Sequence, residues 1–305
     1  MADIGFIGAS GMMGHGMARN LQARGHTLRL TLRQRREPVA DLLAAGAVEA
    51  ASPAELARAC EVVFLCVTGS PEVEAVLGGA DGVLAGARPG LVVVDCSTSE
   101  PASTARLREQ AAAAGVVLVD APLGRSPVQA EAGMLNVMVG AEPEVFARIE
   151  PLLRCFAENV FHVGGPGAGH TVKLLNNFIA QAICNATAEA LGVAARAGLD
   201  PKKLIEVISG GPVNCGLIQM MAPALDGRLD GLKFSLDNAR KDVRYYGHLA
   251  EGLGVPAWIG QAVHQSLVQA CVLGYGDRFV PSLIEAQEQL NGVALVPRPT
   301  PSTPT

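Results

Sequence analysis

Positive charge is scarce and scattered in this sequence. Its 305 residues include 24 lysines and arginines against 29 acidic residues, which gives a formal net charge of −5 and a pI near 5.7. Nucleic acids and anionic membrane surfaces are bound through clustered positive charge. The only tight basic cluster is formed by Arg33, Arg35 and Arg36. The composition therefore argues against a nucleic-acid partner.

A cationic leader and closely spaced cysteine pairs are also missing. Met1-Ala2-Asp3-Ile4 leads straight into an apolar run, which argues against a secretory signal peptide. None of the seven cysteines forms a C-x-x-C pair, and most lie in apolar runs: Cys60, Cys66, Cys96, Cys155, Cys184, Cys215 and Cys271. This usage predicts reduced, buried thiols in a cytoplasmic protein, with neither a disulfide framework nor a metal site.

The sequence is rich in apolar residues. Hydrophobic residues make up 49% and charged residues 17%, which is typical of a globular chain. The length allows two domains of ordinary size, each with its own core.

The chain begins with a strand, a glycine turn and a helix. Residues 3–7 are apolar, Gly8-Ala9-Ser10-Gly11-Met12-Met13-Gly14 follows, and a helix runs on through Leu21. Glycines let the backbone approach a pyrophosphate, and the N-terminus of the helix offers it unpaired N–H groups. We expect cofactor contacts at Gly8, Gly11, Met12 and Gly14. The spacing is G-x-x-G-x-x-G rather than G-x-G-x-x-G, which leaves the details of the phosphate cradle open.

The end of the second predicted strand, residues 28–32, bears on the choice of cofactor. An NAD site commonly has an acidic residue here, whereas NADP needs positive charge for its 2′-phosphate. This chain has Arg33, and the first acidic residue is Glu37. The cluster is either a solvated turn or a phosphate site. We favour NADP(H), with NAD possible and Arg33 as the main phosphate contact.

Strands and helices continue to alternate up to about residue 165. Apolar strands are predicted at 62–67, 91–94, 116–120, 135–139 and 160–163, with a helix at 143–156. Polar loops follow two of them, at 68–71 and 95–98, and such loops at the carboxyl ends of parallel strands hold ligands in open α/β sheets. The fold class predicted for residues 1–165 is a doubly wound, Rossmann-type dinucleotide-binding domain.

Beyond the glycine-rich stretch 164–169, strand patterns disappear. Helices are predicted at about 169–198, 201–208, 214–225, 236–252, 257–273 and 282–291. Residues 166–296 are therefore expected to form an all-α domain for substrate binding and oligomerisation, joined by the long first helix. Residues 297–305 are expected to be a disordered tail. We expect no membrane span, because the apolar first helix carries Asn176, Asn177, Gln181 and Asn185.

The first of these helices contains a polar line within an apolar sequence. Lys173 and Asn177 are four residues apart, so they share one face of the helix with Gln181 and Asn185. From this pattern alone the line is either the solvent-facing side of the helix or an active site.

Five motifs, in order, resemble the β-hydroxyacid dehydrogenase family, which includes 3-hydroxyisobutyrate dehydrogenase and tartronate semialdehyde reductase. They are Met13-Gly14-His15-Gly16-Met17-Ala18-Arg19-Asn20-Leu21, Val94-Asp95-Cys96-Ser97-Thr98, Asp120-Ala121-Pro122, Lys173-Leu174-Leu175-Asn176-Asn177 and Arg240-Lys241-Asp242. The resemblance implies that Lys173 is the catalytic acid/base and Asn177 a substrate contact, and that Lys241 closes over cofactor or substrate. It implies further cofactor contacts at Met13, Val67, Thr68 and Thr98.

One segment departs from the usual family pattern. Where the family has Ser-Gly-Gly after Asp-Ala-Pro, this chain has Leu123-Gly124-Arg125-Ser126-Pro127, which resembles the sulfolactaldehyde reductase branch. We expect Gly124, Arg125 and Ser126 to bind the substrate, with Arg125 adding a forked cationic donor for a carboxylate or sulfonate. The alternative is that Arg125 pairs with an internal acid such as Glu131.

The resemblance implies hydride transfer, without a metal, between a nicotinamide cofactor and a short anionic semialdehyde or 3-hydroxy acid. It also implies a homodimer or homotetramer. Two alternatives are an imine reductase and a catalytically silent dinucleotide-binding scaffold. Lys173 argues against both, because imine reductases of this architecture typically replace it and a silent scaffold has no need of an acid.

Overall fold

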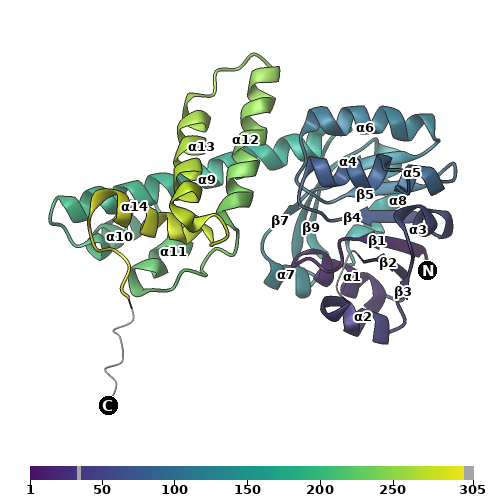
Figure 1. The fold of residues 1–305 in the computed structure, drawn as a ribbon, viewed down its shortest axis with the longest axis horizontal. Helices are drawn as coiled ribbons and strands as arrows, with labels where there is room; N and C mark the ends of the chain where they lie inside the picture. Colours follow the sequence, from purple (N-terminus) through teal and green to yellow (C-terminus); the bar gives the residue numbers. More distant parts are fainter. Residues whose placement is uncertain (33–35, 299–305) are drawn as a thin grey trace. The chain divides into compact units, whose positions relative to one another are not determined.

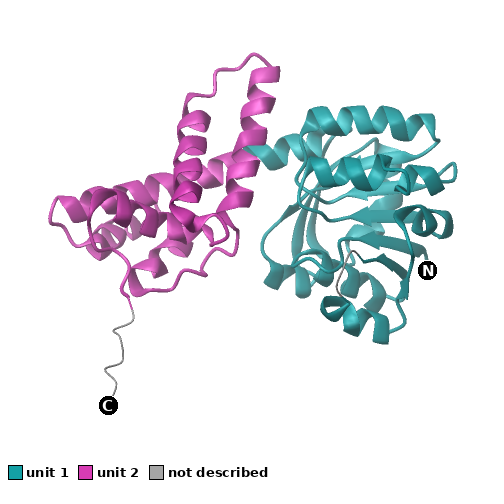
Figure 2. Ribbon diagram, viewed as in Figure 1, with its two compact units in different colours: residues 1–175 teal, residues 176–305 magenta. Residues whose placement is uncertain are grey.

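The structure is a computed structural model that describes residues 1–32 and 36–298 (Figure 1). It divides into two compact units, residues 1–175 and residues from Asn176 onward, coloured separately in Figure 2. The division falls within one long helix, α9 (Ala168–Arg196).

The first unit is an α/β domain built on one sheet. Within the described residues the strand order is β3-β2-β1-β4-β5-β6-β8-β7, with β9 paired to β8. Pairing is parallel throughout, except that β8 runs antiparallel to β6 and β7. The strands are β1 (Asp3–Ile7), β2 (Thr27–Thr31), β3 (Val48–Glu49), β4 (Val62–Leu65), β5 (Val92–Asp95), β6 (Val117–Asp120), β7 (Leu123–Gly124), β8 (Leu135–Gly140) and β9 (Ala157–Gly164).

Helices cover both faces of this sheet (Figure 1), as the predicted doubly wound fold requires. They are α1 (Gly14–Ala23), η1 (Glu37–Val39), α2 (Ala40–Ala44), α3 (Pro53–Ala59), α4 (Ser70–Gly78), α5 (Val83–Gly86), α6 (Pro101–Ala113), α7 (Pro127–Glu131) and α8 (Pro143–Leu153). Four of them begin at a proline, whose fixed φ and missing N–H suit the first position of a helix. Ser52 caps α3 by accepting a 3.1 Å hydrogen bond from the N–H of Glu55.

Two apolar clusters sandwich the central strands. Alternate residues of a strand point to opposite faces, so Val92 and Val94 belong to one cluster and Val93 to the other. All four residues of β4 and of β5 are buried, which explains their unbroken apolar sequences.

The second unit is helical, apart from one isolated bridge between Ser235 and Phe279 among its described residues. Its helices after α9 are α10 (Pro201–Ser209), α11 (Gly216–Met221), η2 (Ala222–Asp226), α12 (Leu236–Gly252), α13 (Trp258–Ala270), η3 (Cys271–Tyr275), η4 (Val280–Ser282) and α14 (Leu283–Asn291). Its apolar core includes Cys184, Ala188 and Leu191 of α9. By length and hydropathy alone α9 also suits a membrane span, but these contacts are those of a core helix.

The predicted elements were right in type and differ at their ends. The strand predicted at 62–67 ends at Leu65, the helix predicted at 143–156 ends at Leu153, and the strand predicted at 160–163 begins at Ala157. The two-residue strands β3 and β7 were not predicted, because segments so short show no period. Of the predicted tail, Pro297 and Arg298 are described, and the side chain of Arg298 lies 3.1 Å from that of Glu288. Residues 299–305 lie outside the described residues.

Candidate active site

Five neighbouring strands of the first unit end in one row. The register pairs Thr31 with Ile7, Ile7 with Leu65, Leu65 with Asp95, and Asp95 with Asp120. The loops that follow these residues therefore leave the same edge of the sheet. The loops after β1, β4 and β5 contain seven predicted cofactor contacts: Gly8, Gly11, Met12, Met13, Val67, Thr68 and Thr98. Ligands bind at this edge in open α/β sheets.

The glycine loop turns tightly after β1. Gly8 has a φ of +98°, and a Cβ there would lie 2.1 Å from the carbonyl oxygen of Cys66. A Cβ on Gly14 would lie 2.2 Å from the carbonyl oxygen of Gly8. That oxygen accepts a 3.0 Å hydrogen bond from the N–H of Gly11. The backbone thus requires glycine at both ends of the loop.

The N-terminus of α1 fits an anion. Its first turn has no acidic residue, and no side chain among the described residues caps it. The side chain of Met12 is 65% exposed beside it. Unpaired N–H groups and the positive end of the helix dipole suit the pyrophosphate of a dinucleotide. Arg33, the predicted contact for the 2′-phosphate, lies outside the described residues.

The loops after β4 and β5 are tied together. The N–H of Val67 donates a 3.0 Å hydrogen bond to Oγ of Ser97, and the N–H of Ser97 donates one of 2.9 Å to Oδ1 of Asp95. Asp95 is 1% exposed. These bonds fix the loops that carry the predicted cofactor contacts Thr68 and Thr98.

The start of α9 is anchored to the end of β6. The carboxylate of Asp120 accepts hydrogen bonds from the N–H groups of Gly167, at 2.7 Å, and His170, at 3.0 Å. Burial raises the pKa of Asp120, and the nearby His170 and these backbone donors oppose the rise. Nδ1 of His170 lies 2.8 Å from the hydroxyl of Thr104, inside the domain. Lys173, partly buried, follows His170 by three residues on the same helix.

The predicted anion-binding segment has an unusual backbone. Arg125 is the only residue other than glycine with a positive φ, 77°, among the described residues. Its Nη1 donates to a carboxylate oxygen of Glu158 and, at 2.6 Å, to the carbonyl oxygen of Met134. The internal acid that Arg125 contacts is thus Glu158, and the suggestion of Glu131 was wrong. The hydroxyl of Ser126 donates to Oε1 of Gln129.

In the second unit, the polar line of α9 is buried. Asn177, Gln181 and Asn185 are 7%, 2% and 8% exposed, whereas the apolar Ile179 is 57% exposed. The line is therefore not the solvent-facing side of the helix. Nδ2 of Asn177 donates a 2.6 Å hydrogen bond to Oδ2 of Asp242.

Asp242 joins two of the predicted substrate contacts. Its Oδ1 lies 3.0 Å from Nζ of Lys241, and Asp242 itself is 1% exposed. Asp242 belongs to one of the five motifs, but the sequence indicates no role for it, because its pairing with Asn177 spans 65 residues. The sequence indicates no role for Asp95, Asp120 or His170 either. The sequence feature that could have identified two of them is an aspartate at the end of an apolar strand, Asp95 in β5 and Asp120 in β6.

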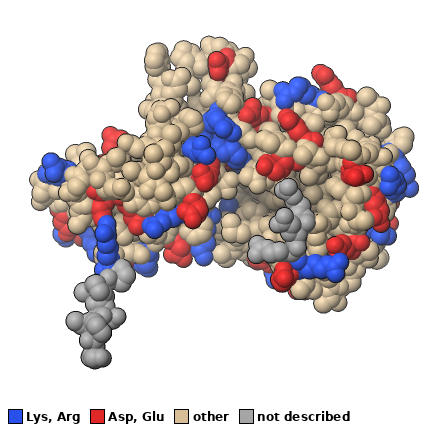
Figure 3. Space-filling model, in the orientation of Figure 1, with Lys and Arg blue, Asp and Glu red and all other residues tan. Residues whose placement is uncertain are grey.

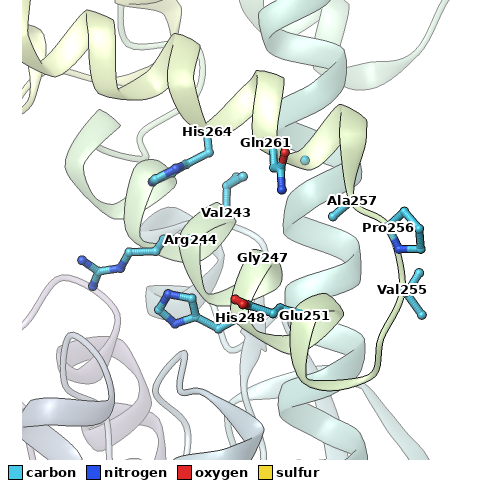
Figure 4. Close-up of a pocket in the computed structure, with 11 residues that line it drawn as sticks. Val243, Arg244, Gly247, His248, Glu251, Val255, Pro256, Ala257, Gln261 and His264 are labelled. Atoms are coloured by element: carbon cyan, nitrogen blue, oxygen red, sulfur yellow. The ribbon is translucent and has the colours of Figure 1, made fainter.

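A cavity of about 510 Å³ lies elsewhere in the second unit, between α12 and α13 (Figure 4). Arg244, His248, Gln261 and His264 contribute polar groups to its lining, and Val243, Pro256 and Ala257 contribute apolar ones. Burial and the charges of Arg240, Arg244 and His248 lower the pKa of His264. None of the predicted site residues lines this cavity.

Comparison with known proteins gives matches along nearly the whole chain. Residues 3–164 match the family model of the NAD binding domain of 6-phosphogluconate dehydrogenase. Residues 167–285 match that described as NAD-binding of NADP-dependent 3-hydroxyisobutyrate dehydrogenase.

Curated relatives match over similar lengths. The chain is 33% identical to 2-(hydroxymethyl)glutarate dehydrogenase of Eubacterium barkeri, over 96% of this chain and 97% of that protein. It is 33% identical to 3-sulfolactaldehyde reductase of Escherichia coli, over 93% and 95% of the two chains. A solved structure of 3-hydroxyisobutyrate dehydrogenase from Mycobacterium tuberculosis with L-serine superposes with a TM-score of 0.83 at 26% identity, covering 93% of this chain and 98% of that one.

Proposed function

Because this chain belongs to the β-hydroxyacid dehydrogenase family and is an oxidoreductase of that class, we propose that it interconverts a short anionic semialdehyde and the corresponding 3-hydroxy acid. The observation that carries the proposal is the anchoring of α9. Asp120 holds the first turn of this helix at the edge of the sheet where the cofactor loops end, and Lys173 lies one turn further on.

We propose NADP(H) as the cofactor, with NAD(H) as the alternative. The glycine loop and the N-terminus of α1 would hold the pyrophosphate of the cofactor. The residues after β4 and β5, including Val67, Thr68 and Thr98, would contact other parts of the same cofactor. The basic sequence at Arg33 and the NADP-dependent family matched by residues 167–285 support the phosphorylated form. When bound, the nicotinamide supplies or accepts the hydride.

Lys173 would handle the proton. In the reductive direction its ammonium group donates a proton to the carbonyl oxygen of the aldehyde, and in the oxidative direction the neutral amine removes it from the hydroxyl group. Asn177 would orient the substrate through its carboxamide, which Asp242 fixes. Lys241, next to Asp242, would contact the substrate or the cofactor. No step in this scheme requires a metal.

The segment Gly124-Arg125-Ser126 would hold the anionic group of the substrate. The relatives are named for substrates that carry carboxylate or sulfonate groups, as in 2-(hydroxymethyl)glutarate and 3-sulfolactaldehyde. Arg125 already shares Nη1 with Glu158, so a substrate anion has to compete with that carboxylate or use the remaining N–H groups of the guanidinium.

A depletion assay tests the proposal. NADPH and NADH are each supplied with a carboxylate semialdehyde, a sulfonate aldehyde, an uncharged short aldehyde and a cyclic imine. We expect turnover of an anionic aldehyde with NADPH preferred. Turnover of the imine alone would assign the protein to the imine reductases, and cofactor binding without any turnover would assign it to silent scaffolds.

A lysine variant tests the chemistry. Lys173→Ala should lower kcat by about 10²–10⁴-fold and leave the Kd for NADPH nearly unchanged, because the proton donor is lost and the cofactor loops are not. The matched control is Lys203→Ala, at an exposed lysine that pairs with Glu206 on α10. A Lys173→Ala enzyme as fast as the control would refute the role of Lys173.

We propose a homodimer or homotetramer on the basis of exposed apolar residues in the second unit. Leu253, Val255, Trp258 and Ile259 are 68%, 55%, 79% and 66% exposed where α12 and α13 meet. Figure 3 shows little charge over the outer end of this hairpin on the face in view. Light scattering should give an oligomeric mass, and Trp258→Lys should reduce it, because a charge would then have to be desolvated in the interface.

We also propose a cytoplasmic location. The seven cysteines are all free thiols, and burial raises the pKa of Cys66 and Cys184 to about 12. Protonated, enclosed thiols suit a reducing compartment. Cell fractionation tests this location directly.

A further inference from the structure

His15 is the first residue after Gly14 in α1, and it lies between two carboxylates from other helices. Its Nδ1 is 2.7 Å from Oε1 of Glu131, at the end of α7, and its Nε2 is 3.0 Å from Oδ1 of Asp41, in α2. The side chain of His15 is 21% exposed. Both of its ring nitrogens are thus engaged at hydrogen-bonding distance.

This geometry favours one protonation state. A carboxylate only accepts hydrogen bonds, and a neutral imidazole has only one N–H to donate. Both contacts are satisfied together only when His15 is an imidazolium. Partial burial lowers the pKa of His15, but hydrogen bonds and charge from Asp41 and Glu131 outweigh it and raise the pKa above its ordinary value of 6.5. The hydrogen bond from His15 in turn lowers the pKa of Asp41.

The carboxylates stay near α1 whether or not His15 is charged. Arg19 Nη2 donates a 2.7 Å hydrogen bond to the carbonyl oxygen of Glu131 and lies 3.0 Å from its Oε2. Further along α1, Nε2 of Gln22 donates 3.1 Å hydrogen bonds to the carbonyl oxygens of Leu42 and Ala45, at the end of α2. These bonds hold α7 and α2 against α1 independently of His15.

Charge balance at this end of α1 therefore depends on His15. With the imidazolium present, two cations, His15 and Arg19, match two anions, Asp41 and Glu131. Without its proton, the cluster carries one net negative charge beside the helix N-terminus that would receive the pyrophosphate. A negative charge there opposes binding of an anion.

We propose that His15 is a positioning residue whose imidazolium cancels the charge of Asp41 and Glu131 beside the glycine loop, and that loss of its proton weakens binding of the dinucleotide. The inference rests on the proposed dinucleotide site at that loop. It requires no contact between His15 and the cofactor.

The direction of the pH dependence follows from linkage. A bound dinucleotide adds negative charge near His15 and so raises its pKa further, which means that the cofactor binds more tightly when His15 is protonated. The Kd for NADPH therefore rises as pH passes upward through the pKa of His15. For one charge near a helix terminus we expect about a two- to fivefold change at low ionic strength, and less in high salt.

The experiment measures the Kd for NADPH by calorimetry on the 305-residue chain, between about pH 6 and pH 9. The wild type should bind more weakly at the alkaline end. His15→Gln should bind weakly at all pH values, since a neutral amide leaves one negative charge of the cluster uncompensated, and His15→Lys should bind tightly at all of them. Thermal melts confirm that each variant is folded, and imidazole NMR of the wild type reports the pKa of His15 with and without NADPH.

A double variant separates charge from packing. His15→Gln combined with Asp41→Asn restores the zero net charge of the cluster, and we expect it to regain the affinity that His15→Gln loses. A double variant as weak as the single one, or a wild-type Kd with the same pH profile as His15→Lys, would overturn the proposal. Absence of NADPH binding in every variant and at every pH would instead refute the proposed dinucleotide site.

Discussion

Oδ2 of Asp120, at the end of β6, accepts a 3.0 Å hydrogen bond from the backbone N–H of His170, in the first turn of α9. The other oxygen of the same carboxylate binds the N–H of Gly167. The first N–H groups of a helix have no partner within the helix, so the buried side chain of Asp120 caps α9. It also fixes the turn that precedes Lys173 in α9.

Asp120→Ala should therefore destabilise the first unit. The buried N–H of His170 and the partly buried N–H of Gly167 lose their acceptor, which should lower the free energy of unfolding by about 2–4 kcal/mol. Urea unfolding measures the loss. Asp120→Asn should lose less, because one acceptor oxygen remains and the buried charge is gone, and Asp81→Ala, at an exposed aspartate, should lose almost nothing. An Asp120→Ala protein as stable as the Asp81→Ala control would contradict the anchoring role.

Gly16→Ala tests the packing of α1 on α7. A Cβ at Gly16 would lie 2.4 Å from the carbonyl carbon of Ala130 and 2.5 Å from the backbone nitrogen of Glu131. Glycine to alanine within a helix ordinarily stabilises by about 1 kcal/mol. Here we expect the opposite sign, a loss of about 1–3 kcal/mol, because backbone atoms have to move apart.

Gly247 in α12 provides the control for Gly16. A Cβ at Gly247 meets nothing within 4 Å, so Gly247→Ala should show the ordinary gain in stability. Chemical unfolding of both variants measures whether each substitution raises or lowers the free energy of unfolding. If both substitutions stabilise the protein, the close approach of α1 and α7 is wrong.

Much of the fold could be predicted from the sequence because its signals are local. Unbroken apolar runs predicted the buried strands β4 and β5, and the helix predicted at 201–208 begins at Pro201, directly after the polar Asp200. The ends of elements were less predictable. Whether Cys66 and Val67 continue a strand depends on whether a neighbouring strand reaches that far, which is a property of the sheet and not of the segment.

The residues of the candidate site could be singled out from the sequence, whereas their side-chain pairings could not. Lys173, Asn177 and the glycine loop stood out as polar or flexible positions in apolar surroundings. The partner of Arg125 did not, because proximity in sequence favoured Glu131, which in the fold contacts His15 and Arg19 while Glu158 takes Arg125. Side-chain pairings across many residues depend on how the helices pack.

Arg125→Gly should distinguish the backbone strain at residue 125 from the contribution of the Arg125 side chain to substrate binding. The φ of 77° at Arg125 lies in the left-handed region, which costs a residue with a side chain roughly 1 kcal/mol and costs glycine little. Arg125→Gly relieves this backbone strain but also removes the ion pair with Glu158. Because that pair is partly exposed, its loss costs about 1 kcal/mol at most. We therefore expect the stability of Arg125→Gly to stay within about 1 kcal/mol of wild type, as measured by urea unfolding.

The catalytic activity of Arg125→Gly should change more than its stability. If Arg125 binds the anionic group of the substrate, Arg125→Gly should lower kcat/KM for anionic aldehydes by about ten- to a hundredfold, the effect of losing a charge-assisted hydrogen bond. The value for an uncharged aldehyde of similar size should change little. Equal losses on both substrates would show that Arg125 shapes the backbone of the loop and does not read the substrate.

Asn177→Asp should make the stability of the second unit depend on pH. Nδ2 of Asn177 lies 2.6 Å from Oδ2 of Asp242, which is 1% exposed. Replacing the amide with a carboxylate puts two buried acids in contact, and Lys241 alone cannot neutralise both. We expect a loss of about 3–5 kcal/mol at mildly alkaline pH, since an uncompensated buried charge is costly.

The loss should shrink in acid. Two carboxylates in contact share a proton, which raises the pKa of the pair in the folded protein above its value in the unfolded chain. The folded state then binds a proton that the unfolded state releases, so its stability is highest at low pH and declines as pH rises through the raised pKa. Urea unfolding of Asn177→Asp at several pH values should follow this course relative to wild type. A loss in Asn177→Asp that does not vary with pH would disprove the buried contact with Asp242.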